Sequence, residues 1–123
     1  MLDRRHRLTR SQDFTRTFRR GVRTGSTTLV VHLAPGQEAA AGDPVRVGLV
    51  VGRAVGSAVT RNQVKRRLRH LLRDRLSSVP DGSVLVVRAL PPAASASFVA
   101  LGDDLDHALA RSVRRLADRG GQR

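Results

Sequence analysis

One segment, residues 57–76, restricts the possible folds of this chain more than any other. Its apolar residues recur at helical spacing and predict a long amphipathic helix, whose buried stripe consists of Val64, Leu68, Leu71 and Leu72. Within it, residues 59–69 carry five cations: Arg61, Lys65, Arg66, Arg67 and Arg69. Arg61 and Asn62 are expected in the first turn, where unpaired backbone N–H groups favour anions. The helix therefore combines a core-facing side with a broad side suited to phosphate.

Strands are predicted on both sides of this helix. Residues 45–51 alternate, with Val45, Val47, Leu49 and Val51 on one face. Residues 84–90 form a second apolar run after the turn at 80–82. A strand, a helix and a strand in this order make a βαβ unit, which implies at least one parallel pair of strands.

Weaker signals define the remaining elements. A short helix beginning at Ser11 or Asp13 carries Phe14 and Phe18 and stops at Gly21. Residues 28–34 predict a strand, 35–44 a hairpin loop and 98–117 a final helix, and a further short strand fits near 23–27. The result is a single domain over residues 1–123, with a core of about 8–117 and a flexible basic N-terminus and 119–123 tail.

The formal net charge of +13 is extreme for 123 residues and implies a polyanionic partner. Nucleic acid is the first candidate and an anionic membrane the second. The chain has no cysteine, so disulfides and thiolate metal sites are excluded. Because neither a signal peptide nor a membrane span is recognisable, a cytoplasmic location is expected.

No catalytic or metal-binding constellation is visible. The four histidines lack metal-ligand spacing, and neither a phosphate-binding glycine loop nor a nucleophile–histidine arrangement occurs. Asp103, Asp104 and Asp106 could hold Mg²⁺, but a favourable interaction with the start of the final helix is the commoner role for such a cluster. We therefore expect no catalytic residue and no metal ligand in the protein itself.

A solvated surface is the ordinary explanation of a basic helix face. Here only Asp74 opposes seven cations between Arg61 and Arg75, and like charges on adjacent helical turns repel unless an anion neutralises them. The first 23 residues add eight arginines against two aspartates.

Phe14 and Phe18 are more often core residues at this spacing, although they could line the edge of a groove.

These features together resemble the protein subunit of bacterial ribonuclease P. The most specific similarity covers residues 53–69, RAVGSAVTRNQVKRRLR, which match the family's signature helix and the glycine turn before it. Residues 46–49 fit the strand that leads into the turn, and Asp13, Phe14, Phe18 and residues 19–21 fit the family's first helix. Gln63 stands in place of a signature arginine.

The resemblance implies an α+β fold, a two-layer α/β sandwich of order α-β-β-(β)-α-β-α with a four-stranded mixed sheet, like domain 2 of ribosomal protein S5. It also implies a left-handed βαβ crossover, although such connections are right-handed in about 98% of cases. The implied reaction is removal of the 5′ leader from precursor tRNA, with hydrolysis by the RNA subunit and Mg²⁺ bound mainly by that RNA and the substrate.

Two groups of binding residues follow from the resemblance. The RNA subunit would be bound by Arg61, Asn62, Lys65, Arg66 and Arg69. The precursor tRNA leader would lie in a cleft between the first helix and the sheet, formed by Phe14, Phe18, His32, Val50 and Arg53. Ribonuclease P RNA and precursor tRNA are thus the expected partners, with no membrane and no DNA.

Three alternatives to this reading remain. A ribosomal protein or general RNA chaperone would share the basic α/β composition, but would stimulate no specific cleavage. A helix-turn-helix DNA binder would need a second helix close before residue 59. A protein of the membrane surface would need a broad apolar helix face with aromatic anchors, which the basic helix lacks.

Overall fold

The computed structural model describes residues 6–7, 11–36 and 42–121. It contains three α-helices, four strands and short 3₁₀ turns in those ranges: α1 (Ser11–Arg20), β1 (Val22–Gly25), β2 (Leu29–Ala34), β3 (Arg46–Val50), η2 (Arg53–Val55), α2 (Ala58–Arg73), η3 (Leu76–Ser78), β4 (Val84–Ala89), η4 (Pro91–Ala94) and α3 (Phe98–Gly121). Each helix and strand expected from the sequence is present, including the short additional strand, and the predicted order is confirmed.

The four strands form one mixed sheet of order β1-β2-β4-β3. β1 pairs antiparallel with β2, β2 antiparallel with β4, and β3 parallel with β4. The expectation that residues 35–44 form a hairpin loop is wrong, because β4 is inserted between β2 and β3. Residues 37–41 lie outside the described part, so only the ends of this connection are visible. The sheet's hairpin is instead β1–β2, where the Ser26 N–H donates to the Leu29 carbonyl.

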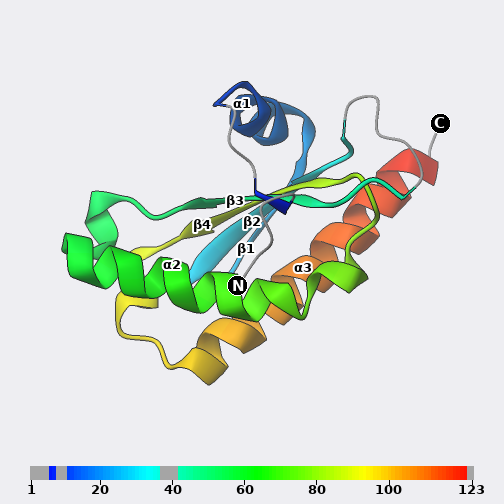
Figure 1. The fold of residues 1–123 in the computed structure, drawn as a ribbon. Helices are drawn as coiled ribbons and strands as arrows, with labels where there is room; N and C mark the ends of the chain where they lie inside the picture. Colours follow the sequence, from blue (N-terminus) through cyan, green and yellow to red (C-terminus); the bar gives the residue numbers. More distant parts are fainter. Residues whose placement is uncertain (1–5, 8–10, 37–41, 122–123) are drawn as a thin grey trace.

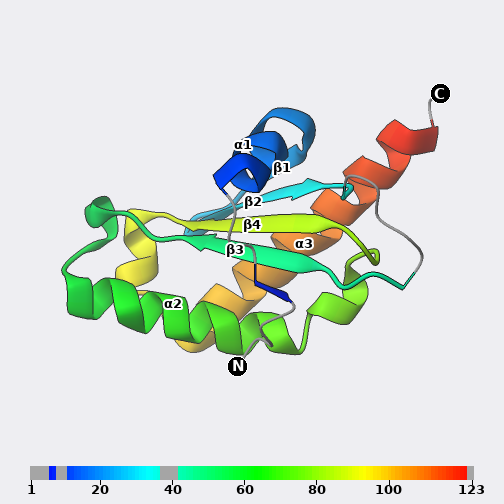
Figure 2. The same ribbon diagram turned by 45° about the horizontal axis from the view of Figure 1, so that its top comes forward.

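The connection from β3 through α2 to β4 is left-handed. In Figure 2, β3 lies in front of β4, both strands run from right to left, and α2 returns from left to right beneath the sheet. This hand is opposite to the one that parallel strands usually adopt. It agrees with the fold that the resemblance implies.

The helices are divided between the two faces of the sheet. α2 and α3 lie below the sheet and α1 lies above it, as Figure 1 shows. The main core fills the space between the sheet and the lower helices, and its fully buried side chains include Leu33, Leu68, Leu72, Leu85 and Leu105. The expected stripe of α2, Val64, Leu68, Leu71 and Leu72, is buried here.

The upper face of the sheet carries a separate set of side chains. Pairing aligns Arg23, His32, Val86 and Gly48 in one row across the sheet, with Val30, Arg88 and Val50 in the next. Val30, His32 and Val86 are buried, whereas Arg23 and Arg88 are exposed. α1 therefore covers part of this face and leaves an open part that bears cations.

Two glycines are required by local geometry. A Cβ on Gly21 would lie 2.6 Å from the carbonyl oxygens of both Leu33 and Thr17, so only glycine lets the end of α1 approach β2 this closely. Gly56 adopts φ 153°, a conformation that L side chains rarely adopt, between η2 and α2. Gly56 thus serves the backbone of the turn that leads into α2.

Secondary structure is present near both ends of the described part of the chain. His6 Nδ1 lies 2.7 Å from the Val45 carbonyl, and Arg7 forms a parallel β-bridge with Val47, so these two residues follow the β3 edge. α3 continues to Gly121, beyond the point at which a flexible tail was expected. Residues 1–5, 8–10 and 122–123 lie outside the described part of the chain.

Candidate nucleic-acid interface

The cationic face of α2 is built on a well-defined helix start. Ser57 is the N-cap, and its side-chain oxygen accepts a hydrogen bond from the Thr60 N–H at 3.3 Å. The Arg61 N–H already donates to the Ser57 carbonyl at 2.8 Å, so it belongs to the helical ladder. The expectation that Arg61 and Asn62 offer unpaired backbone N–H groups is therefore wrong, because α2 begins three residues before Arg61.

The five expected RNA-binding residues share one side of α2. Since each residue turns the helix by about 100°, their directions span less than half of its circumference. Asn62 and Arg66 are exposed, while the members nearer to the core stripe are half-buried: Arg61, Lys65 and Arg69. Long cationic side chains of this kind can pack their apolar stems against the protein and direct their charged ends toward water.

Protein carboxylates do not neutralise this face within the described part of the chain. The ion pairs near it are Arg73 Nε with Asp74 Oδ1 at 3.5 Å and Arg75 Nε with Asp106 Oδ1 at 2.6 Å. Neither pair involves the five residues. In addition, Arg61 Nε is buried without a hydrogen-bond partner. The face therefore has unmatched positive charge and an unsatisfied donor, both of which suit an anion.

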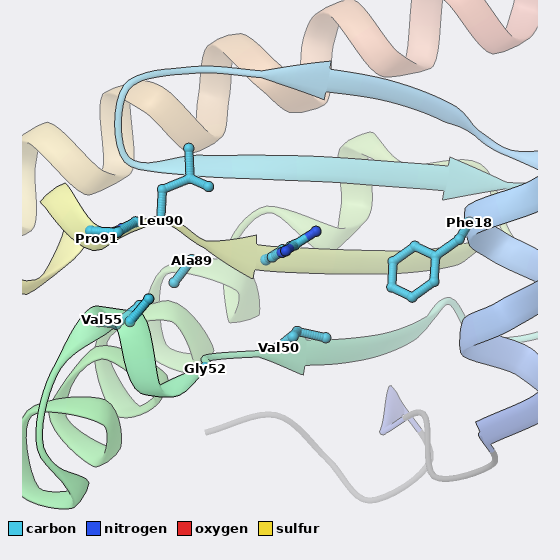
Figure 3. A pocket seen from close by; sticks show the side chains of 9 residues that line it. Phe18, Val50, Gly52, Val55, Ala89, Leu90 and Pro91 are labelled. Atoms are coloured by element: carbon cyan, nitrogen blue, oxygen red, sulfur yellow. The ribbon is translucent and has the colours of Figure 1, made fainter.

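A pocket lies on the opposite face of the sheet, between α1 and the ends of β3 and β4. Its volume is about 320 Å³, and it is lined by Phe18, Val50, Gly52, Ala54, Val55, Arg88, Ala89, Leu90 and Pro91. Figure 3 shows Phe18 reaching in from α1 at one end and Val55 and Pro91 at the other, with Val50 between them. The walls are largely apolar, and Arg88 is the cation among the lining residues.

The pocket and the cationic face meet at η2. Gly52, Ala54 and Val55 line the pocket, and α2 begins at Ala58. There the chain leaves the end of β3 and turns down to α2, which lies below the sheet, as Figure 1 shows. A ligand that lies in the pocket is thus close to whatever is bound at the first turns of α2.

Comparison with known proteins gives one consistent result. The Ribonuclease P family model matches residues 2–113. The ribonuclease P protein component of Nocardioides sp. is 59% identical over 111 residues, and that of Streptomyces bikiniensis is 54% identical over 119; each match covers 90% of this chain and 94% of the relative.

Solved structures agree. The ribonuclease P protein of Staphylococcus aureus has a TM-score of 0.77 at 26% identity, covering 88% of this chain and 97% of that one. The protein from Thermotoga maritima has a TM-score of 0.73 at 28% identity, covering 87% and 97%.

The chain belongs to the ribonuclease P protein family.

Membership makes the chain the protein component of the ribonuclease P ribonucleoprotein, a tRNA-processing enzyme whose RNA is its partner. It also decides against a ribosomal protein or a general chaperone. A helix-turn-helix is excluded by geometry, because the element before α2 is the 3₁₀ turn η2, which follows β3 directly. In the part of the chain that the structure describes, no helix is long and apolar enough to cross a bilayer.

The structure places the five expected leader residues at different distances from the pocket. Phe18 and Val50 line it. His32 lies beneath Phe18, with the ring centroids 4.7 Å apart, and is not part of the lining. Arg53 belongs to η2 between two lining residues, and its side chain is exposed. Phe14 is half-buried on α1 and is also outside the lining.

His32 is held in its neutral form. Burial lowers its pKa from the ordinary value of 6.5, and the nearby guanidinium groups of Arg23 and Arg88 lower the pKa further. Its exposed fraction is 7%, and its Nε2 has no hydrogen-bond partner. His32 thus supports Phe18 from below as an uncharged ring.

Arg88 is a site residue that the sequence analysis missed. It lies on β4 opposite Val30 and Val50, lines the pocket and is exposed. The available signal was a single charged residue in the otherwise apolar run 84–89. Because strand residues alternate between faces, Arg88 had to point away from the main core.

The acidic cluster has a structural explanation different from the one expected. α3 begins at Phe98, so Asp103, Asp104 and Asp106 lie beyond its first turn. Asp104 Oδ2 accepts hydrogen bonds from Thr28 Oγ1 at 2.6 Å and from the Thr28 N–H at 3.2 Å, and Asp106 pairs with Arg75. Two of the three carboxylates thus join α3 to the rest of the fold, and no group of three metal-ligating side chains was found among the described residues.

Proposed function

We propose that α2 binds the ribonuclease P RNA while the pocket beside Phe18 holds the 5′ leader of precursor tRNA. The RNA subunit hydrolyses the phosphodiester bond, and the protein contributes substrate affinity. The observation that carries this proposal is the junction at η2, which joins the pocket directly to the first turns of the cationic helix. When the RNA subunit is bound at α2, binding of the leader in the adjacent pocket takes place within one complex. The affinity for precursor tRNA therefore rises without any new chemical step.

The chemistry of the pocket suits unpaired nucleotides. An apolar wall with an exposed ring, Phe18 at 43% exposure, can stack a base of any kind. Arg88 and Arg53 can each contact a phosphate, and guanidinium forks do so bidentately. The leader would be held without strong sequence preference, because the pocket offers an apolar surface to the bases and positive charge to the phosphate backbone of the leader.

The chemistry of α2 suits structured RNA. Arg66 and Asn62 project into solvent, and the half-buried cations beside them reach the same side. The buried Nε of Arg61 has no partner in the described protein, and a phosphate or base edge of the RNA would satisfy it. Contacts of this type release counterions, so binding should weaken steeply with salt.

Mg²⁺ is assigned mainly to the RNA subunit and the substrate. The described part of the protein supplies no cluster of His, Asp or Glu that fits a divalent ion, and Asp104 and Asp106 are engaged elsewhere. When bound, Mg²⁺ activates water and neutralises developing charge. The cations of the protein reduce repulsion between the two RNAs, so less Mg²⁺ should be needed in its presence. We propose that this reaction takes place in the cytoplasm.

A reconstitution experiment tests the division of labour. Precursor tRNA is incubated at low Mg²⁺ with the RNA subunit alone, the protein alone, or both. We expect cleavage at the mature 5′ end in the mixture, little with the RNA alone and none with the protein alone. Robust cleavage by the purified protein alone would overturn the assignment of catalysis to RNA.

The role of α2 has its own test. Arg66→Ala should weaken binding to the RNA subunit and reduce the slope of log K against log salt by roughly one unit. Arg46→Ala serves as the control, because Arg46 is also exposed but lies on β3 away from α2. Equal affinities and slopes for the two variants would count against α2 as the contact surface.

A further inference from the structure

A second group of arginines lies at the opposite edge of the sheet from β3. Its members come from the end of α1, from the edge strand β1 and from the last turns of α3, and we name them the distal arginine cluster: Arg19, Arg20, Arg23, Arg111, Arg115 and Arg119. All six are exposed. Figure 1 shows the C-terminal turns of α3 extending beyond the sheet, away from α2. The cluster is thus a surface separate from the cationic face.

Two hydrogen bonds hold the three elements of the cluster together. Arg115 donates from Nη1 to the Arg23 carbonyl at 2.5 Å, and Arg119 donates from Nη2 to the Arg20 carbonyl at 2.6 Å. Each bond uses one of five guanidinium N–H groups and leaves the others available. Arg111, Arg115 and Arg119 follow one another at four-residue spacing, so they share one side of α3, roughly 6 Å apart along its axis.

A purely structural role explains part of this arrangement. A cation beside the last carbonyls of α1 stabilises that helix end, and Arg119 fulfils this role. It does not account for the other four arginines, which lie exposed on the same three elements. Like charges at this density destabilise the fold unless something neutralises them.

The described part of the chain provides little such neutralisation. Asp118 is the only carboxylate between residues 111 and 119. The ion pairs recorded for the described residues lie elsewhere, at Arg73–Asp74 and Arg75–Asp106. The distal arginine cluster therefore keeps a large positive charge, and two of its side chains, Arg115 and Arg119, are held in place by hydrogen bonds.

We propose that the distal arginine cluster binds the sugar–phosphate backbone of a second RNA segment of the ribonucleoprotein complex. This inference rests on the proposed function, because it assumes that the chain works between two RNAs. The cluster contains no aromatic residue, so it lacks the stacking platform of a single-strand site. Guanidinium groups that contact phosphates bind RNA irrespective of its nucleotide sequence. The segment can belong to the RNA subunit or to the tRNA body, since both offer the same backbone.

The test uses a double variant, Arg19→Gln with Arg111→Gln, which leaves both carbonyl hydrogen bonds intact. The matched control, Arg7→Gln with Arg46→Gln, removes two exposed charges at the β3 edge. Urea denaturation first verifies that both proteins are folded. Binding is then measured as a function of salt in two arms: protein with the RNA subunit, and assembled holoenzyme with mature tRNA, which has no leader.

We expect the cluster variant to lose several-fold in affinity per arginine at about 0.1 M salt and to flatten the salt slope by about one to two units in one arm. The arm that responds identifies the RNA. Wild-type slopes in both arms, or the same flattening in the control, would overturn the proposal. So would loss of binding to anionic phosphatidylglycerol vesicles with both RNA slopes unchanged, since that result would assign the cluster to a membrane surface.

Failure here is distinguishable from failure of the proposed function. If Arg66→Ala weakens binding to the RNA subunit while the cluster variant behaves as wild type, α2 keeps its role and the distal site is rejected. If the wild-type protein binds neither RNA, the proposed function itself fails.

Discussion

The ring of Phe18 meets the imidazole of His32 in an edge-to-face arrangement, with centroids 4.7 Å apart and planes inclined by 79°. Phe18 is 43% exposed, whereas His32 is 7% exposed. The contact thus joins an open wall of the pocket to a buried residue in the middle of the sheet. It predicts separate consequences for substrate binding and for stability.

Phe18→Ala should weaken binding of precursor tRNA by the holoenzyme and leave mature tRNA unaffected. Loss of one stacking surface costs about 1–3 kcal/mol, which is roughly 5- to 150-fold in affinity. The measurement is the Kd for substrates with and without a leader. Phe98→Ala is the control, because Phe98 is also exposed but contacts His70 of α2. An equal loss for both variants would show that the pocket is not the leader site.

Stability should fall on acidification because of His32. The pKa of His32 in the fold is below 6.5, its value in the unfolded chain, so between these two pH values the unfolded state binds more protons. The contribution of neutral His32 is thus complete above about pH 6.5 and is lost as the pH falls toward the folded-state pKa. Urea denaturation from pH 8 to pH 5 should show a shallower pH dependence for His32→Gln than for the wild type. His107→Gln, which removes an exposed histidine, is the matched control.

Gly21→Ala should lower the free energy of unfolding by about 1–3 kcal/mol, because its Cβ would overlap two backbone carbonyl groups and force α1 away from β2. Gly52→Ala is the natural comparison, since a Cβ there meets nothing within 4 Å and its φ of −84° suits any residue. Chemical denaturation of both variants measures the difference. Equal stabilities would indicate that the approach of α1 to the sheet is looser than the structure describes.

Asp104→Ala should destabilise the fold by about 1–3 kcal/mol, because it leaves the hydroxyl and N–H of Thr28 without their acceptor. Asp103→Ala should change stability by less than about 0.5 kcal/mol, since Asp103 is exposed. The same denaturation series with added Mg²⁺ tests the alternative role of the acidic cluster. A large stabilisation by Mg²⁺ that Asp103→Ala abolishes would contradict the structural assignment.

The sequence predicts the elements of this fold better than their arrangement. The period of Val64, Leu68 and Leu72 identifies α2 because one side of that helix faces the core and the other faces solvent. Strand order carries no comparable signal. Nothing in residues 35–44 indicates that β4, which follows much later, inserts between β2 and β3.

The candidate site, too, can be predicted from the sequence only in part. The cations of α2 are found from sequence because they are neighbours along the chain. The pocket brings together Phe18, Val50 and Arg88, from three elements far apart in the sequence, and only the fold places them side by side. The burial of Val30 and Val86 on the upper face also hides the alternation that would have indicated Arg88.

The connection between the pocket and α2 is short, and this has a consequence for where a substrate is cleaved. Only Gly56 and Ser57 separate η2 from α2, and Gly56 holds an angular backbone conformation. A connection this short would fix the distance between a leader bound in the pocket and an RNA bound at α2. We therefore expect this connection to help set the cleavage position. Inserting one or two residues between η2 and α2 should shift the site of cleavage in precursor tRNA or make it less uniform, even where every contact is retained.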